Sequence, residues 1–130
     1  MKININDNVQ FLKKSEDVKH KDIFEIASEG EWSDSTKFTK DDGTPAKQFS
    51  ILLKLSNGEI KSTIFGSKQL KLLGRAFGTE SADWIGKQVR AWKTASDKAA
   101  DGYMYMYAPV DWTRDDTGEW VEVDINQVVA

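Results

Sequence analysis

The chain has no cysteine and a single histidine, His20, in 130 residues. Without cysteine it cannot form disulfides, thiolate metal sites or a cysteine nucleophile, and one histidine flanked by two lysines cannot supply a histidine-rich metal site. Acidic residues are adjacent at 41–42 and 115–116, but neighbouring carboxylates in loops commonly point apart and stay solvated. We therefore expect a protein that is not an enzyme and that uses no metal or cofactor.

Long apolar runs are also missing. No stretch approaches the roughly 18 apolar residues that span a membrane, and the N-terminal segment MKININDNVQ lacks the apolar core of a secretory signal. Together with the absence of cysteine, this predicts a cytoplasmic protein. The length and the 39% apolar content suit one hydrophobic core. We expect one domain over residues 1–110, followed by an acidic C-terminal tail or edge strand over residues 111–130.

Positive charge is scarce. The formal net charge is −3, but residues 111–130 hold six acidic residues against Arg114 alone, a net of −5, which leaves residues 1–110 at +2. The electrostatic signal for a nucleic-acid partner is therefore weak, and a basic surface would have to come from clustering.

Residues that favour β-structure begin the ordered part of the chain. The segment 22–32 (DIFEIASEGEW) predicts a strand with a bulge at Gly30. The polar stretch 33–46 is expected to be a long loop or an extended hairpin tip.

A tight hairpin is predicted next. Residues 47–55 alternate between apolar and polar, and Asn57-Gly58 favours a type I′ turn. In the partner strand 59–65, Ile60 and Ile64 would then point inward. The side chains that would point outward are Lys61, Thr63 and Phe65.

Helical spacing appears once. The apolar residues of segment 68–77 recur at helical spacing and predict a helix. Residues 83–86 are expected to form a single helical turn that plugs a barrel end. Further strands are expected at 87–93 and 103–110. Three strands, a helix and two strands are the order of a mainly β, five-stranded OB-type barrel with one helix between strands 3 and 4. A two-layer α+β sheet with the same order is the alternative.

Three segments also carry a family resemblance: FLKKSEDVKHKDIFEIASEGEW (11–32), SNGEIKSTIFGSKQLKLLGRAFG (56–78) and DWIGKQVRAW (83–92). They resemble the small OB-fold single-stranded DNA-binding proteins of prokaryotic viruses and related archaeal genomes, and the last is similar to that family's Trp-x-Gly-Lys-x-Val element. The segment YMYMYAP (103–109) departs from the family's alternation of branched apolar and basic residues. The resemblance implies a viral protein of the host cytoplasm that acts in DNA replication.

Binding a single strand without sequence preference requires cations for the phosphates and flat side chains for the bases. In an OB barrel these lie on the outer face of the second and third strands and on the loops that join strands one to two and four to five. We expect the nucleic-acid-binding residues to be Trp32, Lys37, Phe38, Lys40, Lys54, Lys61, Phe65, Arg90, Trp92 and Tyr105. Trp92 and Phe65 have an alternative role, packing under a loop, a terminus or a dimer partner.

The last predicted strand has two apolar faces. One carries Tyr103, Tyr105 and Tyr107, and the other carries Met104, Met106 and Ala108. Tyrosine buries well if its hydroxyl escapes, and methionine packs flexibly, so either face can fill the core.

The function expected from these features is sequence-tolerant binding of single-stranded DNA, with RNA as the other single strand to consider. The alternative is a protein-interaction adaptor barrel in a viral or replication assembly, which would use the same aromatic residues without needing cations beside them. A homodimer and a protein partner for the acidic C-terminus are further expectations.

Overall fold

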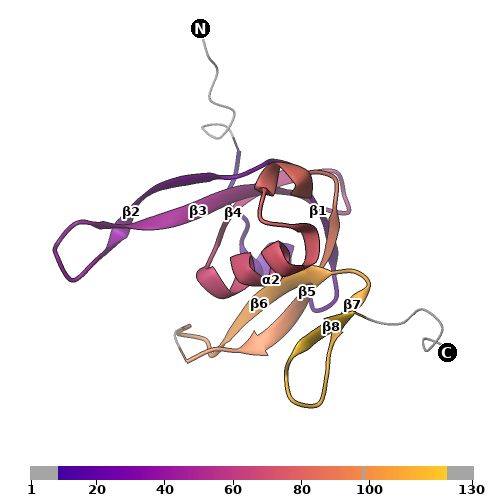
Figure 1. Cartoon of the computed structure of the whole chain (residues 1–130). Helices are drawn as coiled ribbons and strands as arrows, with labels where there is room; N and C mark the ends of the chain where they lie inside the picture. The colour runs from indigo at the N-terminus through magenta and orange to yellow at the C-terminus, as the bar shows by residue number, and fades with distance from the viewer. Residues whose placement is uncertain (1–8, 98, 123–130) are drawn as a thin grey trace, which may run out of the picture.

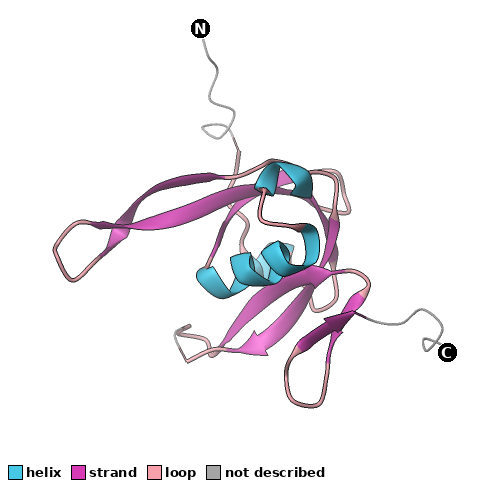
Figure 2. Cartoon of the chain, in the orientation of Figure 1, coloured by secondary structure: helices cyan, strands magenta, loops and turns pink. Residues whose placement is uncertain are grey.

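The computed structural model describes residues 9–97 and 99–122, apart from the side chains of residues 36–38. It is mainly β, with an antiparallel sheet and a helix between β4 and β5 (Figures 1 and 2). The elements are α1 (Lys14–Asp17), β1 (Ile23–Ile26), β2 (Glu31–Thr39), β3 (Pro45–Lys54), β4 (Ile60–Phe65), α2 (Ser67–Phe77), the short 3-10 helix η2 (Ser81–Trp84), β5 (Gln88–Ala95), β6 (Tyr103–Pro109), β7 (Trp112–Arg114) and β8 (Trp120–Glu122). In this part of the chain no helix is long and apolar enough to cross a membrane.

Strands β1 and β2 are two parts of one bent strand, because both pair antiparallel with β3. Ile26 lies opposite Leu53 and Trp32 opposite Phe49, so six steps along the first strand face four steps along β3. Gly30 lies in this irregular stretch with φ of +74°, and a Cβ atom there would meet the Phe49 ring at 2.3 Å. The irregularity predicted at Gly30 is confirmed, and glycine is required there for both its conformation and its size.

Beyond this bend, β2 and β3 continue as a long hairpin that projects from the body (Figure 1). Of the two forms predicted for residues 33–46, the extended hairpin is the one observed. We call β2, β3 and their turn the first arm. The predicted first strand therefore ends at Thr39 rather than at Trp32.

The turn between β3 and β4 contains three residues, 56–58, one more than the two central residues of the type I′ turn predicted at Asn57-Gly58. Leu55 N donates to Glu59 O at 2.8 Å, and Gly58 N donates to Leu55 O at 3.0 Å. Gly58 has φ of +90°, but Asn57 is not among the described residues with positive φ. A type I′ turn needs positive φ at both positions. The added residue shifts the register by one, which turns each side chain of β4 to the other face of the sheet.

The predicted faces of β4 are consequently wrong. Phe65 lies opposite Phe49 and is 4% exposed, and Lys61 lies opposite the buried Leu53. Ile60 and Ile64 instead face outward, at 45% and 41% exposure. The sequence pattern was ambiguous here because apolar residues occur on both faces of this short strand.

The main sheet has the strand order β2-β3-β1-β5-β6, with β4 on the other edge of β3. No backbone pairing joins β4 to β6 among the described strands, so the sheet is not closed into the predicted barrel. Side chains lie along this open seam instead. Gln69 of α2 hydrogen-bonds the backbone of Tyr107 in β6, and the Phe65 and Tyr107 rings lie 5.6 Å apart.

The hydrophobic core lies between the sheet and α2. Leu53, Leu73 and Val89 are fully buried in it. Trp84 of η2 is 4% exposed, and its Nε1 donates to Gly78 O at 2.8 Å. A short helical turn forms here as predicted, but at Ser81–Trp84 rather than at 83–86, and it brings the Trp84 indole into the core.

Two further segments lie against this body. Leu12 N donates to Ser62 O at 2.8 Å and Ser62 N donates to Gln10 O at 3.0 Å, so residues 10–12 run along the outer edge of β4. After β6, strands β7 and β8 pair with each other in a separate two-stranded sheet (Figure 1). Residues 123–130 of the expected acidic tail lie outside the described residues.

Candidate functional site

Two hairpins project from the body and carry aromatic and basic residues: the first arm, and the hairpin of β5, β6 and their turn, which we call the second arm. In Figure 1 both extend from the same side of the body. The second arm has a regular register, with Lys93 opposite Tyr105 and Ala95 opposite Tyr103. This register places basic and aromatic side chains on one face.

A cluster of lysines surrounds Tyr103 on the second arm. Lys14 Nζ lies 4.1 Å and Lys93 Nζ 4.3 Å from the centre of the Tyr103 ring. The Tyr105 ring meets Tyr103 edge to face, with 5.8 Å between centroids. We call Lys14, Lys93, Tyr103 and Tyr105 the tyrosine cluster. It combines flat rings with ammonium groups, which are the two requirements for holding a single nucleic-acid strand.

The helix α1 delivers Lys14 to this cluster. Lys14 Nζ donates to Asp101 Oδ1 and to Tyr103 O, each at 2.6 Å. The hydrogen bond from Lys14 lowers the pKa of the Asp101 carboxyl. Asp17, at the other end of α1, pairs with Lys61 of β4 at 2.8 Å. The four residues of α1 therefore connect β4 to the second arm across the open seam.

The tyrosine face of β6 is the face that continues into the core. Tyr107 is buried, at 6% exposure, whereas Tyr105 is partly buried against the core and Met104 is 41% exposed on the other face. Burial is the main cause that raises the pKa of both the Tyr105 and the Tyr107 hydroxyl. Tyr105, expected in the site, lies in the tyrosine cluster.

Arg90 and Trp92, also expected in the site, lie on the opposite face of β5. The Trp92 ring has edge contacts with Trp120 of β8 at 5.5 Å and with His20 at 5.6 Å. His20 Nδ1 also accepts a hydrogen bond from Lys93 N at 3.1 Å. Trp92 therefore packs beneath another part of the chain, as in the alternative role considered for it.

The first arm carries five of the expected residues, four of them on β2 and in the turn that follows it, and Lys54 at the far end of β3. Trp32 is 62% exposed and touches Phe49 edge to face, with 5.3 Å between centroids. Lys40 is exposed in the turn, where its backbone N–H donates to Thr44 O at 2.8 Å. Lys37 and Phe38 lie on β2, but their side chains fall outside the description.

Lys54 and the remaining expected residues are separated from this surface. Lys54 is exposed at the end of β3. Phe65 is in the core, because of the register shift. Lys61 is 13% exposed and held by Asp17, and its hydrogen bond is the main cause that lowers the pKa of the Asp17 carboxyl. The ammonium group of Lys61 is consequently engaged within the protein.

Sequence reasoning missed Lys14, Lys93 and Tyr103. Lys93 and Tyr103 follow from extending the β5–β6 pairing to the tip of the arm, since 93 and 103 then share a face. Nothing in the sequence places Lys14 beside them, because it is separated from Tyr103 by most of the chain and reaches it through the path of α1.

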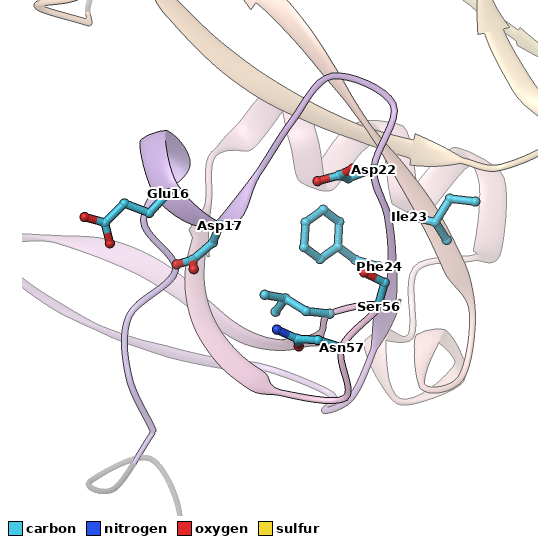
Figure 3. A pocket seen from close by; sticks show the side chains of 8 residues that line it. Glu16, Asp17, Asp22, Ile23, Phe24, Ser56 and Asn57 are labelled. Atoms are coloured by element: carbon cyan, nitrogen blue, oxygen red, sulfur yellow. The ribbon is translucent and has the colours of Figure 1, made fainter.

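A small pocket of about 130 Å³ lies beside α1 and the β3–β4 turn. Figure 3 shows the Phe24 ring within it and the carboxylates of Asp17 and Asp22 around it. Glu16 adds a further acidic side chain to the lining. An acidic lining repels phosphate, so this pocket does not belong to a nucleic-acid site. Among the residues described, no group of three or more His, Cys, Asp or Glu side chains is placed to hold a metal ion.

Comparisons of the chain with protein-family models, with curated proteins and with solved structures found no match.

Proposed function

We propose that this chain is a sequence-tolerant single-stranded DNA-binding protein built on an OB-type framework. The observation that carries the proposal is the tyrosine cluster: two lysine ammonium groups lie within 4.3 Å of the centre of one tyrosine ring, on a projecting arm. Stacking on such a ring is tolerant of sequence, because every base has a flat face, and the Lys93 ammonium group attracts the phosphates. Lys14 is paired with Asp101 and serves to position the Tyr103 ring.

The strand connections support an OB-type interpretation of the fold. Counting β1 and β2 as one bent strand gives three strands, the helix α2 and two strands, with the first strand between β3 and β5. An OB barrel has this order, and the loops between strands one and two and between four and five frame its ligand. The two arms occupy these positions. The open seam between β4 and β6 is the departure from a closed barrel.

The proposed surface is narrower than the one expected from sequence. It comprises the tyrosine cluster on the second arm, with Trp32 and Lys40 on the first arm. Basic charge is modest over the whole chain, with a net charge of −3. Stacking therefore contributes more of the affinity than charge does, and the salt dependence is shallow compared with a strongly basic protein.

Titration of the intrinsic tryptophan fluorescence tests the proposal. Oligo-dT, an RNA of the same length and a DNA duplex would each be added at two salt concentrations. We expect quenching by oligo-dT that weakens at higher salt, and little response to the duplex. Equal affinity for the RNA would mean that the protein binds single strands of either nucleic acid. The absence of any change with oligo-dT, confirmed with a fluorescently labelled strand, would reject the proposal.

A protein-interaction adaptor is the second candidate, and one observation favours it. Phe11, Ile60 and Ile64 are exposed by 55%, 45% and 41%. Phe11 bridges Ser62, which lies between the two isoleucines on the same face of β4, so the three side chains form one apolar patch. A protein partner on this patch would bind with little dependence on salt. That outcome, without binding of oligo-dT, would favour the adaptor.

A further inference from the structure

A second aromatic and basic group lies on the outer face of β5, beneath the hairpin of residues 112–122. Trp120 of this hairpin contacts Trp92 with 5.5 Å between ring centroids. Lys21 Nζ lies 5.8 Å from the centre of the Trp92 ring. Lys21 has φ of +74°, a left-handed conformation that a non-glycine residue adopts rarely. The backbone is thus held in an unfavourable state at the residue that brings a cation to Trp92.

Two buried hydrogen-bond donors lie on this face of β5. Arg90 Nε and Trp92 Nε1 have no hydrogen-bond partner among the residues that the structure describes. The two residues are two positions apart on β5 and therefore point to the same face. Buried donors without acceptors are rare in folded proteins. A guanidinium and an indole N–H on one face of a strand suit oxygen acceptors, and the guanidinium favours an anionic one.

The hairpin that contacts Trp92 is lightly attached. Its two strands of three residues each pair with one another rather than with the main sheet. Arg75 connects it to α2: the guanidinium donates to Trp120 O at 2.5 Å and lies 4.9 Å from the centre of the Trp112 ring. An isolated two-stranded hairpin is marginally stable in water. Loss of a few such contacts is therefore enough to release it.

The hairpin also has the chemistry of the ligand it would exclude. Residues 112–122 contain four carboxylates and one guanidinium, a formal net charge of −3. They bring an aromatic ring, Trp120, into edge contact with Trp92. A strand of DNA likewise presents flat bases and negative charge.

We propose that Trp92 and Arg90 form a second subsite for one base and one phosphate of single-stranded DNA, and that Trp120 of the hairpin occupies this subsite in the free protein. On binding, the strand displaces the hairpin, a base stacks on Trp92, and a phosphate oxygen accepts hydrogen bonds from Arg90 Nε and Trp92 Nε1. The inference rests on the proposed function. It adds that the hairpin of residues 112–122 and the DNA strand compete for contact with the Trp92 ring.

Replacing Trp120 tests the competition. Affinity for 5′-labelled oligo-dT would be measured by fluorescence anisotropy for the full chain and for Trp120→Ala, Trp92→Ala and the double variant. If the hairpin competes, Trp120→Ala binds about two- to ten-fold more tightly, the range set by one aromatic contact. In the Trp92→Ala background the same change has no effect. Val121→Ala, on the same strand and 39% exposed, is the matched control and leaves affinity unchanged.

Hydrogen exchange of the unmodified protein gives a second readout, which does not depend on a variant folding. The amides of residues 112–122 exchange faster when oligo-dT is bound, because the released hairpin is marginal alone. Weaker or unchanged binding by Trp120→Ala, or stronger protection of the hairpin amides by oligo-dT, would overturn the inference while leaving the proposed function intact. Absence of oligo-dT binding by the unmodified protein would reject both.

Discussion

The side-chain amide of Gln69 binds the backbone of Tyr107 twice: Nε2 donates to Tyr107 O and Oε1 accepts from Tyr107 N–H, each at 2.6 Å. Gln69 is 4% exposed. The paired amide substitutes for a neighbouring strand at the edge of β6, where the sheet is open. It satisfies a backbone donor and a backbone acceptor that would otherwise be buried without partners.

Replacing Gln69 with leucine keeps most of its volume and removes both hydrogen bonds. We expect the free energy of unfolding to fall by about 2 kcal/mol or more, because two buried backbone groups lose their partners and each costs about 1–3 kcal/mol. Urea denaturation of Gln69→Leu beside Gln88→Leu, an exposed glutamine on β5, measures the difference. Equal stability of the two variants would mean that the Gln69 contacts contribute nothing.

Gln69→Glu adds a dependence on pH. A neutral carboxyl can donate to Tyr107 O and accept from its N–H, but a carboxylate can only accept. Burial raises the pKa of the introduced glutamate in the folded state. The variant is therefore relatively stable at low pH and loses stability as the pH rises through the raised pKa. Denaturation midpoints at several pH values, relative to those of the unmodified protein, test this; a flat difference would contradict it.

The ion pair between Asp17 and Lys61 makes the folded protein lose stability as the pH falls into the acid range. The hydrogen bond from Lys61, followed by that from the backbone of Lys13, lowers the pKa of Asp17. Its contribution is present above the ordinary pKa of aspartate and is lost as the pH falls through the lowered value. Asp17→Asn should reduce the melting temperature at pH 7 and reduce the loss of stability in acid. Asp34→Asn, whose partner Lys47 is 59% exposed, is the control and should change little.

Gly30 and Gly43 separate the effect of backbone conformation from the effect of space. Both have positive φ, but a Cβ at Gly30 meets the Phe49 ring at 2.3 Å, and at Gly43 it meets nothing within 4 Å. We expect Gly43→Ala to destabilise by about 1 kcal/mol from φ alone. Gly30→Ala should cost about 1–3 kcal/mol more, because the Phe49 ring must move. Thermal melts of both variants compare them, and equal losses would contradict the steric account.

The tyrosine cluster makes separate predictions for its ring and its charge. Tyr103→Ala should lower the affinity for oligo-dT by about 1–3 kcal/mol if a base stacks on the ring. Lys93→Ala should make the slope of log affinity against log salt concentration shallower by about the contribution of one phosphate contact. Lys68→Ala removes an exposed lysine from α2 and serves as the control for charge. Identical salt slopes for Lys93→Ala and Lys68→Ala would exclude Lys93 from the interface.

The elements of the fold were largely predictable from sequence, whereas the faces were less so. The helix at Ser67–Phe77 and the turn at Trp84 follow from local spacing. The orientation of the β4 side chains does not follow from local spacing, because Asn57-Gly58 is compatible with a loop of two or of three residues. A difference of one residue moves every side chain of β4 to the other face of the sheet. Tyr103 and Met104 posed the same problem, since both faces of β6 are apolar enough to be buried.

Contacts between distant segments account for the rest of the site. Lys14 reaches Tyr103 because α1 crosses from β4 to the second arm, and Trp120 reaches Trp92 because the chain folds back after β6. Neither contact has a local pattern in sequence. Trp92 lies on the outer face of β5, as expected, and its contact with Trp120 is the packing arrangement given as its alternative role.

The helix α1 gives the seam between β4 and β6 a property that a hydrogen-bonded barrel lacks. Backbone pairing is insensitive to ionic strength, but Lys14 with Asp101 and Asp17 with Lys61 are ion pairs, and the first of these is partly exposed. Dissolved salt screens exposed charges over about 8–10 Å. Ionic strength thus has two effects on this protein. It weakens the attraction between cations and phosphates, and it weakens the ion pair with Asp101 that holds Lys14 beside Tyr103.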